Sequence, residues 1–494
     1  MNPENSAGRV SKIRSLHSRY NPQGEADRYI NSLSLNQGIR CFILIEPGLG
    51  YMITPLKKRF PGARVIALHA GNNSETGEHH VTVSGGASPA VPDSEWYPDS
   101  GAPVQDFLER EIPDSEAAEL RILEWRPALS VYGEAYRELV EETAAFIKRS
   151  DANYRTLKRF GRTWFSNFFK NINLFRTVLC PGCLSVPFLV TGAGPGLEDA
   201  IPFIKEGSRR NGLFILASSS SVAALQARDI NPGMVISADG GAWAKMHLYE
   251  CFRRAAFPFS MAVSLSAALP SQCETLPILP ISDGSLWQTL ILRELDIPFI
   301  ALPQRGTVIA AALDLAFALT KNNVFIAGID LAVPDIRSHA RPYSLDRLME
   351  EKEGRLNPLY SQTFIRSSLL KAGGSYSIYA SWFKKQIPSY PKRLYSLGKN
   401  NSIFTSPENT SFDMGTSESS PVYFKTAAIT HKGKSTGKAL SILKKALKDT
   451  VHSAILREEL GALLFPGKEI PAHEEIIDAI STLAARDRGS PHHG

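Results

Sequence analysis

Short apolar runs alternate with stretches of helical spacing through the middle of the chain. Runs at 186–190, 213–217, 234–237 and 324–327 are almost entirely apolar, and an alanine-rich helix is predicted over 308–320. Short apolar runs bounded by turn residues are typical of strands that are buried on both faces of a parallel sheet. The pattern therefore predicts an α/β fold in which parallel strands end at one common edge.

Three glycines follow the first of these runs and precede a helix. Gly192, Gly194 and Gly196, with Pro195 between the last two, separate the run from a segment that opens with Glu198. Glycine lets backbone N–H groups approach a ligand closely, and a helix start carries partial positive charge. The loop is a candidate phosphate site, although glycine in α/β proteins also serves merely to turn the chain.

The next two runs end in hydroxyl and carboxylate side chains. Ser219 lies in a run of four serines, and Asp239 and Gly240 follow the third apolar run. Ligands of parallel α/β sheets bind beyond the carboxyl ends of the strands, so these residues are candidates for nucleotide or sugar contacts. The alternative for each residue taken singly is structural, because serine caps helices and aspartate makes turns.

A second cluster of candidates lies downstream. Gly306 and Thr307 open the alanine-rich helix, Gly328 and Asp330 close the fourth apolar run, and His339 lies in the polar loop that follows. A helix start, an acid at a strand end and a histidine in a loop thus come in succession. Together with the first cluster, they predict a site at the carboxyl edge of the sheet.

The N-terminal part shows a similar pattern on a smaller scale. Apolar runs at 42–45 and 65–68 flank a tight loop at 48–50 and a helix predicted over 52–59. Cofactor-binding folds of this kind place an acid after the second strand to hold ribose hydroxyls. Here that position is His69, so we expect a degenerate Rossmann-like module that serves for contacts with a partner.

The chain changes character beyond residue 404. Residues 405–420 are polar and rich in helix breakers, which predicts a linker. Apolar positions then recur at helical spacing over 439–447, 453–464 and 474–485. Such stripes normally pack against the body of the protein, and the alternative is that they dock a partner protein.

These patterns divide the chain into three parts within the α/β class. They are an N-terminal Rossmann-like domain over 1–175, a central parallel-sheet domain over 176–404, and a linker with a C-terminal helical region over 405–494. At 494 residues the chain is long enough for more than one core.

Composition restricts the function classes. A net charge of only +6 does not demand a nucleic-acid partner. No apolar run reaches the roughly 18 residues that a membrane-spanning helix needs, and the first residues lack signal-peptide character. The odd number of cysteines, five, fits a reducing compartment. We expect a cytoplasmic protein without a transmembrane segment.

In their order and spacing, the candidate segments resemble a known family. Segments 192–197, 230–239, 306–308 and 328–339 resemble the motility accessory factor (Maf) glycosyltransferases, which attach nonulosonic acids to flagellin. The central part is also similar to 6-hydroxymethylpterin diphosphokinases (MptE-like) and to sialyltransferases that use CMP-sugars. Segments 20–22, 46–51, 164–167, 379–383 and 394–403 extend the resemblance to about residues 15 to 405. Related loops carry serine at the position of Gly196.

The resemblance implies a flagellin glycosyltransferase. It would transfer a nonulosonic acid of the pseudaminic or legionaminic type from a CMP-sugar to Ser or Thr of flagellin, with a flagellin chaperone as a further partner. CMP is a less charged leaving group than a diphosphate, so N–H groups at two helix starts can neutralise it without metal. Neither a tightly bound cofactor nor a divalent ion is required.

Transfer also needs a base that takes the proton of the acceptor hydroxyl. His339 is the first candidate and Asp330 the second, and Asp239 is placed on the ribose or at the acceptor's entrance.

Two other functions stay open. A pterin diphosphokinase uses ATP and magnesium, and Asp239, Asp283 and Asp330 would then have to converge on the metal. The third possibility is a flagellin-binding module without catalytic activity.

Overall fold

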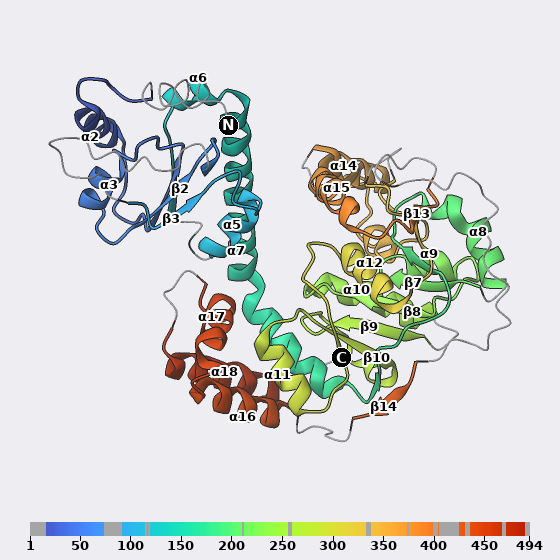
Figure 1. The fold of residues 1–494 in the computed structure, drawn as a ribbon. Coiled ribbons are helices and arrows are strands. Elements are labelled where there is room, and N and C mark those ends of the chain that lie inside the picture. The colour runs from blue at the N-terminus through green and yellow to red at the C-terminus, as the bar shows by residue number, and fades with distance from the viewer. Residues whose placement is uncertain are drawn as a thin grey trace. The chain divides into compact units, whose positions relative to one another are not determined.

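A computed structural model describes residues 16–73, 91–113, 116, 119–209, 212–254, 259–331, 337–372, 375–398, 404, 424–429, 435–466 and 471–489. The described chain forms two compact units, each with its own parallel sheet, which confirms the predicted α/β class (Figure 1). The first unit takes in described residues of 1–159 and 465–469, and the second those of 160–464 and 470–494. The predicted linker at 405–420 lies outside the described residues.

The first unit is built on a sheet of parallel strands in the order β3-β2-β1-β4. The strands are β1 (Cys41–Ile45), β2 (Arg64–Leu68), β3 (Ser94–Trp96) and β4 (Leu120–Glu124). The accompanying helices are α2 (Pro22–Ser32), α3 (Ile53–Arg59), α5 (Val104–Glu111) and α6 (Pro127–Tyr132). The strands predicted at 42–45 and 65–68 and the helix predicted at 52–59 are confirmed, with ends shifted by one residue.

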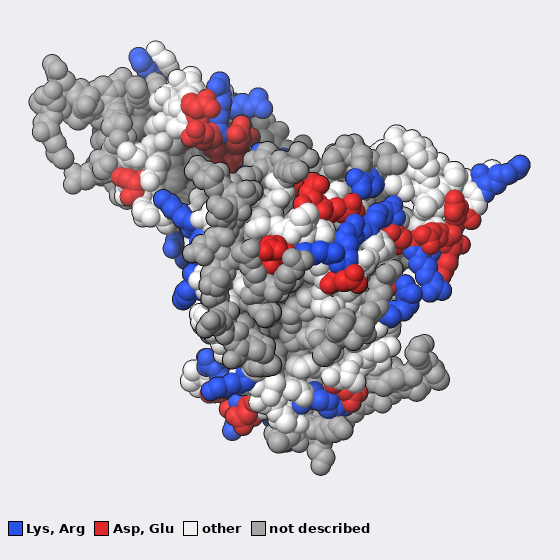
Figure 2. Space-filling model, turned by 90° about the vertical axis from the view of Figure 1, so that its right-hand side faces the viewer, with Lys and Arg blue, Asp and Glu red and all other residues white. Residues whose placement is uncertain are grey.

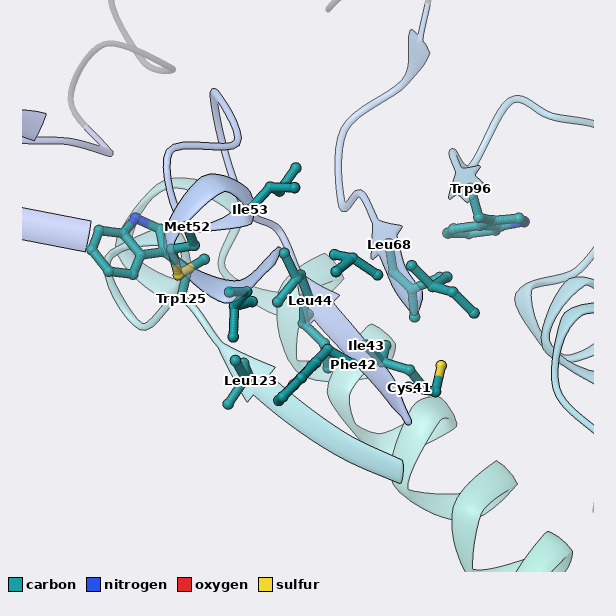
Figure 3. Packing of buried hydrophobic residues seen from close by; sticks show 14 of the residues in the cluster. Cys41, Phe42, Ile43, Leu44, Met52, Ile53, Leu68, Trp96, Leu123 and Trp125 are labelled. Carbon is teal, nitrogen blue, oxygen red and sulfur yellow. The ribbon is translucent and has the colours of Figure 1, made fainter. Parts of the chain in front are cut away.

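The core of the first unit forms around β1. All five residues of β1 are buried, because β2 and β4 pair with its two edges and apolar residues cover its faces. Figure 3 shows Leu44 of β1 in one cluster with Leu68 of β2, Leu123 of β4 and the residues Met52 and Ile53 at the start of α3. A strand in this environment reads in the sequence as a continuous apolar run.

The second unit contains a larger sheet. Its strands are β5 (Thr177–Leu179), β6 (Phe188–Thr191), β7 (Phe214–Ser218), β8 (Met234–Ser237), β9 (Ser260–Ser264), β10 (Pro277–Ser282), β11 (Ile300–Ala301), β12 (Val324–Ala327), β13 (Leu394–Ser396) and β14 (Thr426–Ala428). They lie in the order β13-β12-β6-β7-β8-β9-β10-β5-β14, with β11 beside β10. The pairings are parallel except for β14 with β5. The four predicted runs are β6, β7, β8 and β12.

Helices of the second unit connect these strands and cover the sheet. They are α8 (Leu197–Arg209), α9 (Val222–Gln226), α10 (Ala242–Arg254), α11 (Leu286–Glu294), α12 (Val308–Leu319), α13 (Asp346–Glu350), α14 (Leu359–Ala372) and α15 (Ser375–Gln386), with 3-10 turns η2 (Ser271–Thr275) and η3 (Ile387–Ser389). The predicted alanine-rich helix is α12, which packs across β6, β7, β8 and β12. Its small side chains allow this close approach to the sheet.

The predicted C-terminal helices are confirmed as α16 (Ser435–Lys448), α17 (Ser453–Leu464) and α18 (His473–Gly489). They pack on one another, and α16 and α17 also pack on α11 (Figure 1). Their apolar stripes are buried there, with Leu443, Leu456 and Ile480 inaccessible to solvent. The stripes therefore face the body of the second unit, as the packing interpretation predicts.

A long helix, α7 (Glu134–Leu174), contributes to both units, and the boundary between the units falls inside it. Its second half packs in the second unit, where the backbone of α17 approaches it closely. A Cβ atom at Gly161 would lie 2.3 Å from the carbonyl oxygen of Leu463, so only glycine fits at this point of the helix. Arg162 Nε donates to the carbonyl of Leu464 at 3.0 Å.

None of the helices that the structure describes is both long enough and apolar enough to cross a membrane.

Candidate functional site

A row of hydroxyl groups marks the carboxyl edge of the second sheet. The last residues of its described parallel strands include Thr191 (β6), Ser218 (β7), Ser237 (β8), Ser264 (β9), Ser282 (β10) and Ser396 (β13). Because these strands run in the same direction, the hydroxyls lie along one edge. Ser237 is 1% exposed, and its Oγ has no hydrogen-bond partner among the described residues. A buried hydroxyl without a partner at the ligand-binding edge of a sheet indicates a place for a polar ligand group or water.

The loop between β6 and α8 is closed by Asp330. Gly196 N donates to Asp330 Oδ2 at 2.8 Å. Cβ atoms at Gly194 and Gly196 would lie 2.3 Å and 2.2 Å from oxygens of the same carboxylate, so these two glycines leave the space that Asp330 occupies. The N–H at the start of α8 is thus already occupied by a carboxyl group of the protein itself, that of Asp330.

The other glycines of this loop allow two loops to touch. Gly192 N donates to Ala327 O, and Gly194 N donates to Gly328 O, both at 2.8 Å. A Cβ atom at Gly192 would lie 2.4 Å from the carbonyl oxygen of Gly328, which itself has a φ of 66°. Pro195 accepts from the N–H of Glu198 at 3.0 Å. An external phosphate at Gly196 would therefore have to displace Asp330 from its N–H.

The carboxyl of Asp330 is harder to ionise in the folded protein than in water. Burial raises the pKa of its carboxyl above the ordinary value, the N–H of Gly196 lowers it, and the negative charge of Asp199 raises it again. The net direction is upward. A carboxylate with a raised pKa is a better base when it is ionised, and the role of Asp330 as a base stays a prediction.

His339 is fixed to the same glycine loop through its neighbour. Ala340 N donates to Ala193 O at 2.8 Å. The imidazole of His339 stacks on the ring of Tyr343, with centroids 3.9 Å apart and planes 12° apart, and its Nδ1 lies 2.8 Å from Ser338 Oγ. Asp330 is thus bonded to Gly196, and the residue after His339 is bonded to Ala193. The segments that carry the two candidate bases therefore meet on the same glycine loop.

A pocket lies beside His339. Its lining also includes Arg341, Asp346, Met349 and Thr363, so it combines charged, polar and apolar groups. Arg341 and Asp346 form an ion pair within this lining. The space in it is about that of one water molecule, so it can hold a water-sized group next to the imidazole.

Ser219, Asp239 and Gly240 have structural partners. Ser219 is buried, and its carbonyl accepts from Cys251 Sγ at 3.6 Å. Asp239 is exposed, and its Oδ1 accepts from Gly241 N at 2.8 Å, which is the turn that the structural alternative predicts. A Cβ atom at Gly240 would lie 2.4 Å from Trp164, so this glycine makes room for α7. Ligand roles for these three residues stay predictions.

Thr307 acts as the N-cap of α12. Its Oγ1 accepts from Ala310 N at 3.0 Å, while Gly306 before it is exposed, with open space around it. The strands that lead to α8 and α12 are β6 and β11, and β7, β8, β9 and β10 lie between them in the sheet. Both helix starts thus belong to the same edge, and their convergence on one ligand stays a prediction.

The three carboxylates of the diphosphokinase alternative follow different strands. Asp239 comes after β8, Asp283 after β10 and Asp330 after β12. Asp283 is held by Ser285 Oγ at 2.6 Å and by the side-chain amides of Gln288 and Gln304. Among the described residues, no group of three or more His, Cys, Asp or Glu side chains is arranged to hold a metal ion.

The equivalent edge in the first unit is filled by that unit's own side chains. His17 Nε2 accepts from Leu49 N at 3.0 Å inside the loop at 48–50, and burial lowers the pKa of this imidazole. Glu46 Oε2 accepts from Ala70 N at 2.7 Å, and its Oε1 lies 3.8 Å from His69 Nδ1. The tight loop that the sequence singled out here binds a histidine of the same unit.

Charges on the visible surface are mixed rather than segregated. On the face shown in Figure 2, basic and acidic side chains lie next to one another among the described residues. This agrees with the small net charge of +6. On this face, the described side chains do not form a continuous basic patch of the kind that nucleic-acid-binding proteins present.

Several residues of the site were not indicated by any sequence pattern. Tyr343 and Arg341 line the pocket beside His339 and belong to no motif, while the sequence indicates Glu198, which accepts from Arg341 N, only as part of a helix start. An acid in the first turn of a helix that follows a glycine loop is the one signal that points to Glu198.

Comparison with known proteins gives a family match over the centre of the chain and a more distant relative of known sequence. A protein-family model described as 6-hydroxymethylpterin diphosphokinase MptE-like matches residues 145–335, which include the glycine loop and Asp330 and end before His339. An uncharacterised protein of Treponema pallidum (strain Nichols) is 27% identical over 309 residues, 62% of this chain. The match spans 65% of that relative's length.

A solved structure shares the fold. The Maf glycosyltransferase from Magnetospirillum magneticum AMB-1 superimposes with a TM-score of 0.51 and 13% sequence identity, covering 97% of this chain and 77% of that one. The likeness extends over both units and the C-terminal helices. At this level of identity the likeness is one of fold alone.

Proposed function

We propose that this protein transfers a nucleotide-activated sugar to a hydroxyl group of a protein acceptor. The main support is that two candidate bases, His339 and Asp330, are attached to one glycine loop at the carboxyl edge of the second sheet. Of the hydroxyl residues that end the strands of this edge, Ser237 has a buried Oγ without a hydrogen-bond partner among the described residues, which suits it to bind a hydroxyl of a sugar or ribose. The fold shared with a Maf glycosyltransferase supports the same class of reaction.

The proposed donor is a CMP-activated nonulosonic acid, and the proposed acceptor is a Ser or Thr hydroxyl of flagellin. The acceptor oxygen forms a bond to the anomeric carbon, the bond from that carbon to the phosphate oxygen breaks, and CMP leaves with the bonding electrons. The proton of the acceptor hydroxyl goes to His339 or Asp330. The cytoplasmic location and a chaperone partner belong to the same proposal.

The part that Asp330 takes in this scheme depends on whether its carboxylate stays bound to the glycine loop. In the structure its carboxylate binds Gly196 N. When it stays there during the reaction, the donor phosphate is bound elsewhere, and the start of α12 is the remaining predicted place. When it leaves, it exposes the start of α8 and becomes available to accept the proton.

The direct test is transfer in vitro, followed by intact-mass measurement of flagellin. We expect a mass increase equal to one or more nonulosonic acid residues in the presence of the CMP-sugar. His339→Ala should lower the rate of transfer by roughly 100-fold or more, the usual contribution of general base catalysis. His452→Ala is the matched control, because His452 lies in the turn before α17, where its Nδ1 pairs with Asp449, and is not part of the proposed site. Absence of any mass change with wild-type protein and a range of CMP-nonulosonic acids would refute the proposal.

The family match at 145–335 makes a pterin diphosphokinase the second candidate. Calorimetry separates the two, because the transferase should bind CMP without magnesium, whereas the kinase should bind ATP with magnesium. Heat with ATP and magnesium, but none with CMP, would favour the kinase. Heat with neither ligand would favour a flagellin-binding module without catalytic activity.

A further inference from the structure

We propose that Glu198 is the positioning residue of this site and fixes the loop that carries His339 against the start of α8. This inference rests on the proposed transferase function, in which His339 takes the acceptor's proton. Glu198 lies in the first turn of α8, directly after the glycine loop, and its side chain is 27% exposed.

The carboxylate of Glu198 collects contacts from three arginines. Glu198 Oε1 accepts from the backbone N–H of Arg341 at 2.8 Å. Glu198 Oε2 accepts from Arg337 Nη1 at 3.4 Å, and Arg228 Nη2 lies 3.7 Å from Oε1. Two of the three partners, Arg337 and Arg341, lie two residues before and two residues after His339.

Both backbone polar groups of Arg341 are hydrogen-bonded to side chains. Its N–H donates to Glu198, while its carbonyl accepts from Arg228 Nη1 at 2.6 Å. Arg228 follows α9 and also donates to the carbonyl of Ala224 in that helix at 3.0 Å. The loop is thus bonded to α8 through Glu198 and to the residue after α9 through Arg228. Glu198 contacts both the loop and Arg228.

These contacts exceed what a helix start alone requires. An acid in the first turn interacts favourably with the helix dipole wherever its side chain points. Here the carboxylate is instead used in directional, charge-assisted hydrogen bonds to a loop 143 residues later in the chain. Since the imidazole of His339 is carried by this loop, its position depends on Glu198, although Glu198 itself need not touch the substrate.

The test uses full-length protein and two readouts. In Glu198→Ala, the amide of Arg341 loses its acceptor, so hydrogen exchange in peptides covering 337–343 should become faster while exchange in β7 and β8 stays unchanged. The kcat of transfer should fall on the order of 100-fold, the cost of a misplacement of about 1 Å, with little change in the KM for the donor.

Two variants separate positioning from general effects. Glu198→Gln keeps an oxygen that can accept from Arg341 N–H, so it should restore slow exchange and most of kcat. Lys205→Ala removes an exposed charge two turns farther along α8 and should behave as wild type in both readouts.

Unchanged exchange at 337–343 in Glu198→Ala would overturn the inference, as would a normal kcat with faster exchange. If the wild-type protein shows no transfer at all, the proposed function fails, and a positioning role in that reaction fails with it. Exchange alone would then still show whether Glu198 anchors the loop, so the two failures are distinguishable.

Discussion

Asp330 and Gly196 illustrate how one pair of residues sets the state of the glycine loop. The carboxylate binds the N–H of Gly196 and takes the space that a side chain at 194 or 196 would need. Related loops of the resembling family carry serine at position 196. The departure is explained by this structure, because a Cβ atom there would lie 2.2 Å from Asp330 Oδ1.

The first prediction concerns this steric coupling. Gly196→Ser should destabilise the protein by about 1–3 kcal/mol, the usual cost of forcing atoms into an occupied space. The loss should be much smaller when the same change is made in Asp330→Ala, because the colliding carboxylate is gone. Urea denaturation of the four proteins of this double-mutant cycle measures the coupling. If the two changes in the free energy of unfolding simply added, a side chain at position 196 would not collide with the carboxylate of Asp330. Gly306→Ala, where nothing lies within 4 Å, is the control for a glycine with room for a side chain.

The second prediction concerns pH. Because the folded state raises the pKa of Asp330, it holds the proton more tightly than the unfolded chain does. The stability that this carboxyl contributes is therefore complete below its unfolded pKa and is lost as pH rises through the folded value. Asp330→Asn imitates the protonated form and keeps an acceptor for Gly196 N.

We therefore expect Asp330→Asn to be more stable than wild type at neutral pH, with a difference that shrinks as pH falls toward about 4. Urea midpoints for both proteins across this range check it. A difference that is constant with pH, or that grows toward acid, would contradict the raised pKa.

At the scale of secondary-structure elements, side chains from distant helices complete the ends and loops of the second sheet. Asn171 Nδ2 in α7 donates to the carbonyls of Leu265 and Ala267 after β9, both at 2.9 Å. Glu459 in α17 accepts from the N–H groups of Leu286 and Trp287 at the start of α11, at 2.8 Å and 3.2 Å. The C-terminal helices therefore contribute to the end of an element as well as covering its apolar face.

The third prediction tests this cap. Glu459→Ala should cost about 0.5–2 kcal/mol, the range for removing a helix N-cap. Glu458→Ala is the matched control, since Glu458 is the exposed neighbour on the same helix. Thermal unfolding of both variants gives the comparison. Equal midpoints for the two would mean that the carboxylate of Glu459 does not stabilise α11.

At the scale of the whole molecule, two sheets have separate cores. One cluster of buried residues surrounds β1 in the first unit, and another lies between the second sheet and α12. Since α7 runs through both units, the question is whether they unfold together or in turn.

The fourth prediction is that calorimetry shows two transitions. Leu44→Ala removes a buried side chain from the first core, and Leu216→Ala removes one from the second. Each change should cost about 2–5 kcal/mol and lower only the transition of its own unit. A single transition that both variants lower equally would show that α7 couples the units into one cooperative structure.

The sequence by itself determined the fold class and four of the ten described strands of the second sheet. β8 and β12 match their predicted runs, and β6 and β7 are shifted by one or two residues, because strands buried on both faces must be apolar throughout. The glycine loop and the acid and histidine near it were also visible, since those residue types are unusual at strand ends. No part of α7 is predicted from the sequence, because many aromatic residues of its second half are buried in the second unit and do not follow one simple apolar stripe.

Only the tertiary structure decided what these residues do to one another. Asp330 meets Gly196 across 134 positions of the chain, and Glu198 meets Arg341 across 143. No local pattern encodes such pairs, because they depend on β12 lying beside β6 and on the loop after it folding back over α8. The sequence thus specified the glycine-lined helix start, and long-range packing placed a carboxylate of the protein itself there.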